Sequence, residues 1–187
     1  MRRPLPRRLR ARLPKRLRTD QSGMALIEFA ITLPILLSLY LLGAQLSNAI
    51  ACSRKVTVAT RETADLVTRY ARLTAAQVDT ILGASSQIMT PFPAGDAVVR
   101  ISQVRVRQDN TVYIEWSRAR NGAALEKGAA YTDLPTSMQT PGSTYIMAEV
   151  SYLWTPTVPF GDLTAKTLSD KFYMLPRLSS SVTCNDC

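Results

Sequence analysis

The chain has 187 residues, with 23 Lys and Arg against 14 Asp and Glu, which gives a formal net charge of +9. This length suits one modest domain with an additional segment, but not two independent cores. The sequence contains no histidine, so the commonest general base and metal ligand is missing. No nucleophile–base pair and no phosphate-binding loop stands out. The composition therefore argues against an enzyme, and we expect no cofactor, metal or small-molecule substrate.

The positive charge is concentrated at one end of the chain. Residues 1–23 hold nine Arg or Lys and one Asp, whereas the other 164 residues hold 14 basic and 13 acidic side chains. A basic body would favour a nucleic-acid partner, but a basic tail before an apolar run favours a membrane topology signal. We therefore expect a membrane protein that does not bind nucleic acid.

A long apolar run follows the basic tail. Between Met24 and Ala51 the only charged side chain is Glu28. A helix over these residues is roughly 40 Å long, which is enough to cross a hydrocarbon core of about 30 Å. Pro34 lies inside this helix and is expected to kink or loosen it. Because basic residues are retained in the cytoplasm, the N-terminus is predicted to be cytoplasmic and the C-terminal domain to lie outside the cytoplasm.

Two helical stretches are predicted after the apolar run. Apolar residues recur at three- and four-residue steps, which predicts that the first helix continues to about Arg72. The residues from Thr74 to Gln77 have the form of a capping box, which predicts a second, short helix over residues 75–82. Gly83 is a plausible stop for that helix.

Strands are predicted further along the chain. Residues 98–106 and 111–116 are rich in β-branched and aromatic residues and flank a loop at residues 108–110, as in a hairpin. In the second of these strands, Val112, Ile114 and Trp116 share one phase and are expected to face the core. In the first, Val99 and Ile101 differ in phase from Val104 and Val106, which predicts either a bulge or a strand buried on both faces.

The strongest strand signal lies at residues 145–154, where Ile146, Ala148, Val150, Tyr152 and Trp154 share one phase. A short helix at residues 163–168 and an extended piece at residues 172–175 are predicted after it. The predicted fold class is α+β: a long N-terminal transmembrane helix continues into a small extracytoplasmic domain with a mainly antiparallel β-sheet.

These patterns predict four parts of the chain. Residues 1–23 form a cleaved basic leader, and residues 24–53 form the transmembrane helix. Residues 54–83 form an extracytoplasmic helical segment, and residues 84–187 form a β-rich extracytoplasmic domain.

The sequence has three cysteines, Cys52, Cys184 and Cys187. A zinc site needs about four ligands, and neither a second cysteine pair nor a histidine is present. A disulfide between Cys184 and Cys187 and a pair of free thiols both remain open at this point. Cys52 is then either buried at the membrane face or paired between chains.

Gly23 and Glu28 mark the point where the basic tail meets the apolar run. An ionised side chain inside a bilayer costs about 2.5–3.5 kcal/mol, so Glu28 is expected to have a partner. Cleavage after Gly23 would create an α-amine at Met24. Opposite charges about 4 Å apart gain roughly 4 kcal/mol at an effective dielectric constant of 20, before desolvation is subtracted.

The segment from Ser22 to Phe29 is similar to a type IV prepilin cleavage site, in which a glycine is followed five residues later by a glutamate. The chain as a whole resembles the TadE-like minor pilins of tight-adherence (Tad) pilus systems. That resemblance rests on Gly23, on residues 28–30, on residues 33–34 and, more weakly, on the strand end at residues 149–152, residues 176–177 and the terminal cysteine pair.

The resemblance implies a pseudopilin of the bacterial inner membrane that a prepilin peptidase cuts between Gly23 and Met24. It implies assembly with other minor pilins (TadE-like and TadF-like), with a major Flp pilin and with an inner-membrane assembly platform. Such a protein acts in the assembly, initiation or tip complex of the pilus, and also reaches the extracellular filament. The length of the mature part argues against the bulk filament subunit.

Two other interpretations of the sequence remain. Residues 49–51 precede Cys52 and look like a signal-peptidase site or a loose lipobox, which would make the chain a secreted protein or a lipoprotein. The apolar run is longer than a usual signal-peptide core of about 7–15 residues, which argues against that alternative. The second alternative is an uncleaved bitopic membrane scaffold, in which Gly23 and Glu28 occur together by coincidence.

Overall fold

The computed structural model describes residues 22–158 and 164–187, so most of the basic leader predicted at residues 1–23 lies outside the described residues. The chain divides into two units, one ending at Gly43 and one running from Ala44 to Cys187, and each is described by itself. Helix α2 (Ser22–Thr68) is continuous from the first unit into the second. The first unit, as far as it is described, is this helix.

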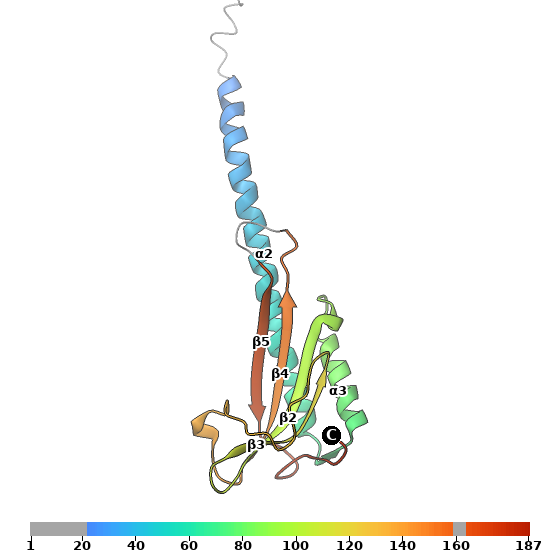
Figure 1. Ribbon diagram of the computed structural model, residues 1–187. Helices are drawn as coiled ribbons and strands as arrows, with labels where there is room; N and C mark the ends of the chain where they lie inside the picture. Colours follow the sequence, from blue (N-terminus) through green and yellow to red (C-terminus); the bar gives the residue numbers. More distant parts are fainter. Residues whose placement is uncertain (1–21, 159–163) are drawn as a thin grey trace, which may run out of the picture. The chain divides into compact units, whose positions relative to one another are not determined.

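The second unit is built on a four-stranded sheet (Figure 1). The strand order is β3-β2-β4-β5, and all three neighbouring pairs are antiparallel. The long apolar helix and this sheet confirm the α+β class. The elements after α2 are β1 (Arg72–Leu73), α3 (Ala75–Gln87), η1 (Ala94–Asp96), β2 (Ala97–Val106), β3 (Val112–Arg120), η2 (Thr136–Met138), β4 (Thr144–Trp154), β5 (Lys166–Met174) and β6 (Thr183–Cys184).

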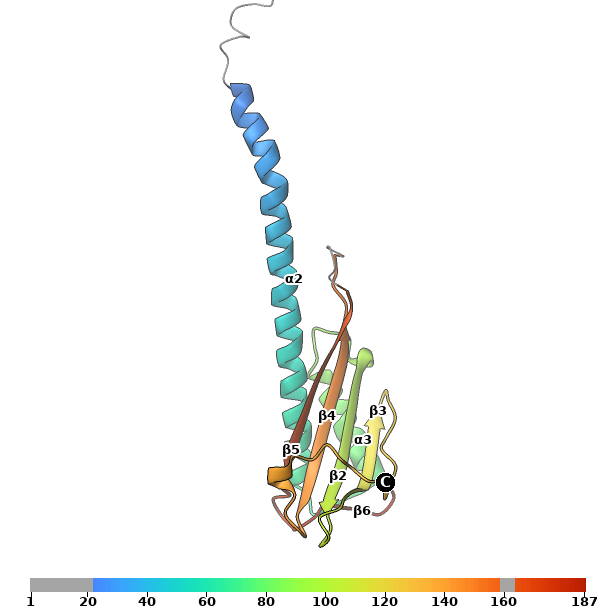
Figure 2. The ribbon, with the colours of Figure 1, turned by 60° about the vertical axis from the view of Figure 1, so that its left-hand side comes forward.

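The main core lies between one face of the sheet and the two helices (Figure 2). Helix α2 contributes small side chains such as Cys52, Ala59 and Ala64, and α3 contributes Val78 and Leu82. The shared phase predicted for the five residues from Ile146 to Trp154 is confirmed, because all five belong to this cluster. The cluster comprises Cys52, Val56, Ala59, Ala64, Val67, Leu73, Val78, Leu82, Met89, Ala97, Val99, Ile101, Trp116, Ile146, Ala148, Val150, Tyr152, Trp154, Val182 and Cys184.

The ends of the helices differ from the sequence prediction. Helix α2 ends at Thr68 rather than near Arg72, because Arg72 and Leu73 form β1 and pair in parallel with β6. The capping box of α3 is confirmed: the Thr74 hydroxyl accepts from the backbone of Gln77, whose side chain accepts from the backbone of Thr74. Gly83 does not end α3, which continues to Gln87 because its last turn still buries side chains against the sheet.

A β-bulge in the β2–β3 pair decides which face each residue occupies. Gln103 pairs with Trp116 and Val104 pairs with Ile114, so Glu115 is the extra residue. Trp116 belongs to the main core, whereas Val112 and Ile114 belong to a second cluster on the opposite face. The prediction that these three share one face was therefore wrong. Of the two alternatives for the strand at residues 98–106, burial on both faces is the one that β2 shows, and the extra residue lies in β3.

The end of the chain also differs from the prediction. No helix forms over residues 164–168, and Leu163 lies outside the described residues. Lys166–Met174 is instead one continuous strand, β5, paired along its length with β4. Leu168, Phe172 and Met174 alternate along this strand and pack on the main core, so an alternation of period two overrides the weak helical pattern.

The second cluster is covered by the connection between β3 and β4. This cluster consists of Val104, Val106, Val112, Ile114, Leu134, Tyr145 and Met147.

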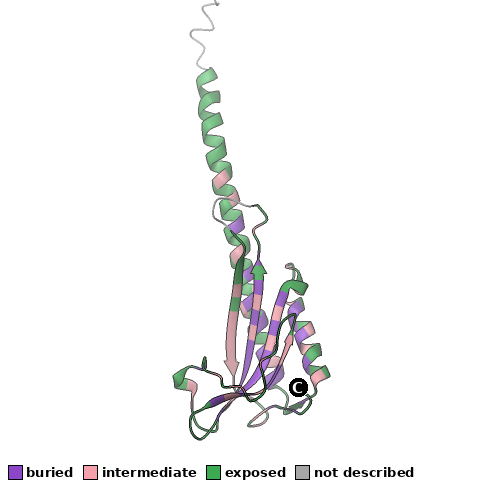
Figure 3. Cartoon of the chain, in the orientation of Figure 1, coloured by how far each residue is buried: buried purple, intermediate pink, exposed green. Residues whose placement is uncertain are grey.

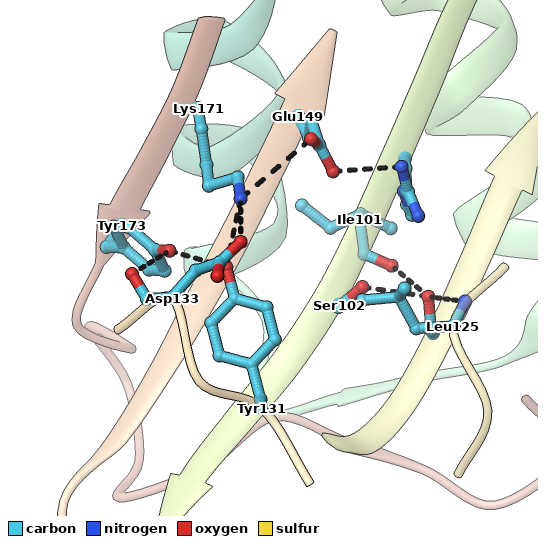
Figure 4. Close-up of polar contacts among 10 residues, drawn as sticks. Ile101, Ser102, Leu125, Tyr131, Asp133, Glu149, Lys171 and Tyr173 are labelled. Atoms are coloured by element: carbon cyan, nitrogen blue, oxygen red, sulfur yellow. Dashed lines mark hydrogen bonds and ion pairs between the residues drawn. The ribbon is translucent and has the colours of Figure 1, made fainter. Parts of the chain in front are cut away.

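A polar cluster also fastens the connection between β3 and β4 to the sheet (Figure 4). Lys171 Nζ lies 3.1 Å from Asp133 Oδ2 and donates to the Tyr131 hydroxyl at 3.2 Å. The Tyr131 and Tyr173 hydroxyls are 2.6 Å apart, and Glu149 accepts from Arg100 at 3.0 Å. These contacts hold the connection against the sheet.

Burial raises the pKa of Tyr173, and its hydrogen bond with Tyr131 raises that pKa further. The folded protein therefore holds the phenol proton at a pH where an unfolded tyrosine, with a pKa of about 10, releases it. The resulting stabilisation is complete below about pH 10 and is lost as the pH rises above that value.

We predict that the urea midpoint of the full chain in detergent falls between about pH 9 and about pH 11, and that it falls less in Tyr173→Phe. Tyr70→Phe, which changes an exposed tyrosine, is the control and keeps the wild-type pH dependence. An unchanged fall in Tyr173→Phe would contradict the assignment.

Candidate functional site

The first part of α2 is exposed along its length (Figure 3), and most of its exposed side chains are apolar. Met24, Leu26, Ile27 and Phe29 are all more than half exposed, and the pattern continues to Leu42. Residues 23–43 make a helix of about 32 Å, close to the thickness of a bilayer core. In the part of the chain that the structure describes, Gly23–Thr68 is the one helix long and apolar enough to cross a membrane. It is consistent with a single membrane span.

Two hydroxyl side chains of this segment bond within the helix. The Thr32 hydroxyl donates to the Glu28 carbonyl, and the Ser38 hydroxyl donates to the Pro34 carbonyl, each at 2.7 Å. Such bonds allow hydroxyl side chains to sit in lipid. Helix α2 continues through Pro34. The carboxylate of Glu28 differs from these two hydroxyls, because it has no such bond within the described residues.

The Glu28 side chain is exposed, and within residues 22–158 and 164–187 its carboxylate makes no hydrogen bond or ion pair. Met24 lies four residues earlier, and residues four apart share one face of a helix with Cβ atoms about 5–6 Å apart. An α-amine at Met24 would therefore lie close to this carboxylate. Gly23 has no atom within 4 Å of the position that a Cβ would take, so the fold does not itself require glycine there.

Within the second unit, the side of α2 that faces away from the sheet also carries apolar groups. Ile50 and Val58 are exposed and line a shallow groove together with Ala51, Arg54 and Lys55. The opposite side of the same turns carries Cys52, Val56 and Ala59 in the core. This part of the helix thus offers one surface to the sheet and another to an external partner.

Cys184 and Cys187 are joined by a disulfide, with Cα atoms 5.5 Å apart. Asp186, between them, accepts from the backbone N–H of Ala75 at the start of α3, so this bond ties the chain end to the domain. The two sulfurs and the Asp186 carboxylate lie near one another, but bonded sulfurs are not thiolate ligands for a metal. Cys52 is a free, fully buried thiol.

Gln45 and Asn48 are two polar residues of α2 whose role was not foreseen from the sequence. The Asn48 side chain accepts from the Trp154 indole at 2.8 Å, and the Gln45 side chain accepts from the backbone of Thr157 at 3.3 Å. They are the two amide side chains between Met24 and Ala51, which is the signal that could have identified them.

Residues 23–65 match the family model described as TadE-like protein. The match begins at Gly23, contains Glu28 and Pro34, and continues into the part of α2 that packs on the sheet. The recognition of a TadE-like domain from the sequence is thereby confirmed for these residues. The TadE-like family consists of pilin-like proteins associated with Tad pilus systems, which are not enzymes.

No curated protein matches the chain, and no solved structure matches it. Of these comparisons, the TadE-like match is the one that indicates a function for the chain. The residues outside the match are interpreted from their contacts and their exposure.

We predict that the three cysteines differ in reactivity. A thiol-alkylating reagent should leave the folded full chain unlabelled, label Cys52 alone after unfolding without reductant, and label all three cysteines after unfolding with reductant. Peptide mapping by mass spectrometry reads out the sites. Labelling of Cys184 without reductant would contradict the pairing, and labelling of Cys52 in the folded chain would contradict its burial.

Proposed function

We propose that the chain is a minor pilin, or pseudopilin, of a Tad type IV pilus, which a prepilin peptidase cuts between Gly23 and Met24. It acts in the assembly, initiation or tip complex of the pilus. The observation that carries this proposal is the TadE-like match beginning at Gly23, on a helix whose apolar surface has no cover within the described chain. Such a surface needs either lipid or neighbouring helices around it.

Glu28 has the role of specifying how the subunit docks. After cleavage, the α-amine of Met24 and the Glu28 carboxylate compensate each other, within one subunit or between neighbours in a helical bundle. Between neighbours the pair sets the axial register, because any other register leaves a charge buried without a partner. The absence of a bond to this carboxylate within the described residues supports an external or newly created partner.

The two surfaces of α2 suit a subunit that moves from the bilayer into a bundle. The apolar side chains up to Leu42 satisfy lipid first and neighbouring helices later, and the groove beside Ile50 and Val58 extends that contact surface beyond the span. In this proposal the partners are other minor pilins, the major Flp pilin and the inner-membrane assembly platform.

The proposed topology is a single pass through the bacterial inner membrane. Residues 1–23 are the cytoplasmic leader, the helix at residues 24–53 contains the membrane span, which ends near Gly43, and the helical segment at 54–83 and the β-rich domain at 84–187 are periplasmic. The disulfide between Cys184 and Cys187 suits an oxidising compartment.

The geometry weighs against cleavage near Cys52. That site lies within the continuous helix α2, and the Cys52 side chain is fully buried in the main core. Cleavage there would also remove Gln45 and Asn48 together with their hydrogen bonds to residues 154–157. A lipid on Cys52 would have to leave the core in which that side chain packs.

Gly23→Leu tests the cleavage step. We expect the variant to be inserted in the membrane but to keep its leader, whereas the wild type starts at Met24; intact-mass measurement separates the two. Gly43→Leu is the matched control, because both glycines lie in α2 and neither has an atom within 4 Å of the position that a Cβ would occupy. Normal processing of Gly23→Leu, or an unprocessed wild type, would argue for an uncleaved scaffold.

Glu28→Ala tests the docking role. The variant should be inserted and processed like the wild type, yet be absent from sheared pili and fail to support piliation. Immunoblots of membrane and filament fractions and electron microscopy measure this. Glu62→Ala removes an exposed acidic side chain of the same helix outside the apolar run and should assemble normally. Normal piliation with Glu28→Ala would exclude the proposed role.

A further inference from the structure

One end of the second unit carries a group of apolar and aromatic residues with little charge. It is formed by the turn before η1 and by the end of β4 with the residues that follow it. We name it the proximal rim and define it as Phe92, Leu153, Trp154, Thr155 and Val158. Leu153 is 54% exposed and Val158 is 39% exposed, whereas Trp154 is buried behind them.

The proximal rim is tied to the first turns of the second unit's part of α2. The Trp154 indole donates to Asn48, and the backbone of Thr157 donates to Gln45. The rim therefore lies at the level of residues 45–48 of the helix. A hollow of about 370 Å³ lies in this region, lined by Asn48, Phe92, Tyr152, Leu153 and Trp154 among others.

The length of the apolar run fixes where a bilayer would end along α2. With Met24 at the inner boundary, a core of about 30 Å takes up about 20 residues of helix and ends near Gly43. Gln45 and Asn48 then lie in the outer headgroup layer. The rim lies in the same layer, because its residues are hydrogen-bonded to these two side chains.

Residues 153–158 carry no charge, and Leu153 and Val158 are their exposed aliphatic side chains; Asp96 borders the same hollow. Trp154 is buried and its indole donates to Asn48, so Leu153 and Val158 provide the exposed apolar contact. Exposed apolar side chains rimmed by polar groups are typical of surfaces that meet a membrane or another protein. The far end of α2 differs, since Arg69, Arg72 and Arg177 lie near Thr68.

We propose that the proximal rim is a lipid-contacting surface that rests in the outer headgroup layer while the protein resides in the membrane. This inference rests on the membrane topology of the proposed function. The bilayer is the occupant because the rim is joined by hydrogen bonds to the turns that leave the apolar run. The contact holds the periplasmic domain against the membrane surface before assembly, and extraction of the subunit exposes the rim.

Tryptophan quenching tests the contact. The full chain is reconstituted in phosphatidylcholine vesicles with or without lipid brominated at shallow acyl positions. Leu153→Trp adds an indole to the rim, and Leu178→Trp adds one to an exposed leucine near the far end of α2, where Arg177 bonds to Thr68. We expect brominated lipid to remove a larger fraction of the emission from Leu153→Trp than from wild type, and a smaller fraction from Leu178→Trp.

Each outcome of this experiment decides the inference. Equal quenching of the two variants, or a lower quenched fraction in Leu153→Trp than in wild type, overturns the lipid contact and leaves the rim to water or to a partner subunit. Carbonate washing of the same vesicles shows whether the chain is inserted. Release of the chain by carbonate overturns the membrane topology and this inference together, whereas retention without quenching overturns this inference alone.

Discussion

The exposed apolar surface of α2 between Gly23 and Gly43 is the constraint on which the other features depend. About 20 residues of such helix are unfavourable in water, and the described chain offers nothing to cover them. One charged side chain, Glu28, lies within that surface and needs compensation there. In the proposed function, the cleavage after Gly23, the membrane topology and the use of the helix in assembly all follow from the need to cover this surface and neutralise this carboxylate.

The same helix meets a different requirement in the second unit, where it serves as one layer of a soluble core. The buried positions carry small side chains such as Ala59 and Ala64, which allow the sheet to approach closely. Thr60 and Thr63 are fully buried, and their hydroxyls donate to backbone carbonyls one turn earlier, so neither hydroxyl is left without a bond. The outward positions remain available to neighbouring helices.

Local patterns in the sequence were enough to predict the apolar helix, the capping box at Thr74, the β2–β3 hairpin and the inward phase of β4. The errors arose where distant segments decide the structure. Helix α2 stops at Thr68 because β6, more than 100 residues later, pairs with residues 72–73. Residues 166–168 are extended because β4 offers a partner along the whole of β5. At the candidate site, Gly23 and Glu28 were identifiable from spacing, but Gln45 and Asn48 depend on contacts with the end of β4 that no local pattern contains.

The two faces of the sheet pack against different parts of the chain, and the bulge at Glu115 changes the face to which the side chains of β3 point. Residues on one face hold the sheet to the helices, and those on the other contact the β3–β4 connection. Residues 123–143 contribute no side chain to the main core that supports α2, whereas Asn121 bonds to the carbonyl of Ala97 at its edge. Under the proposed function, substitutions in residues 123–143 change one face of the domain and leave the helix that joins neighbouring subunits as it is.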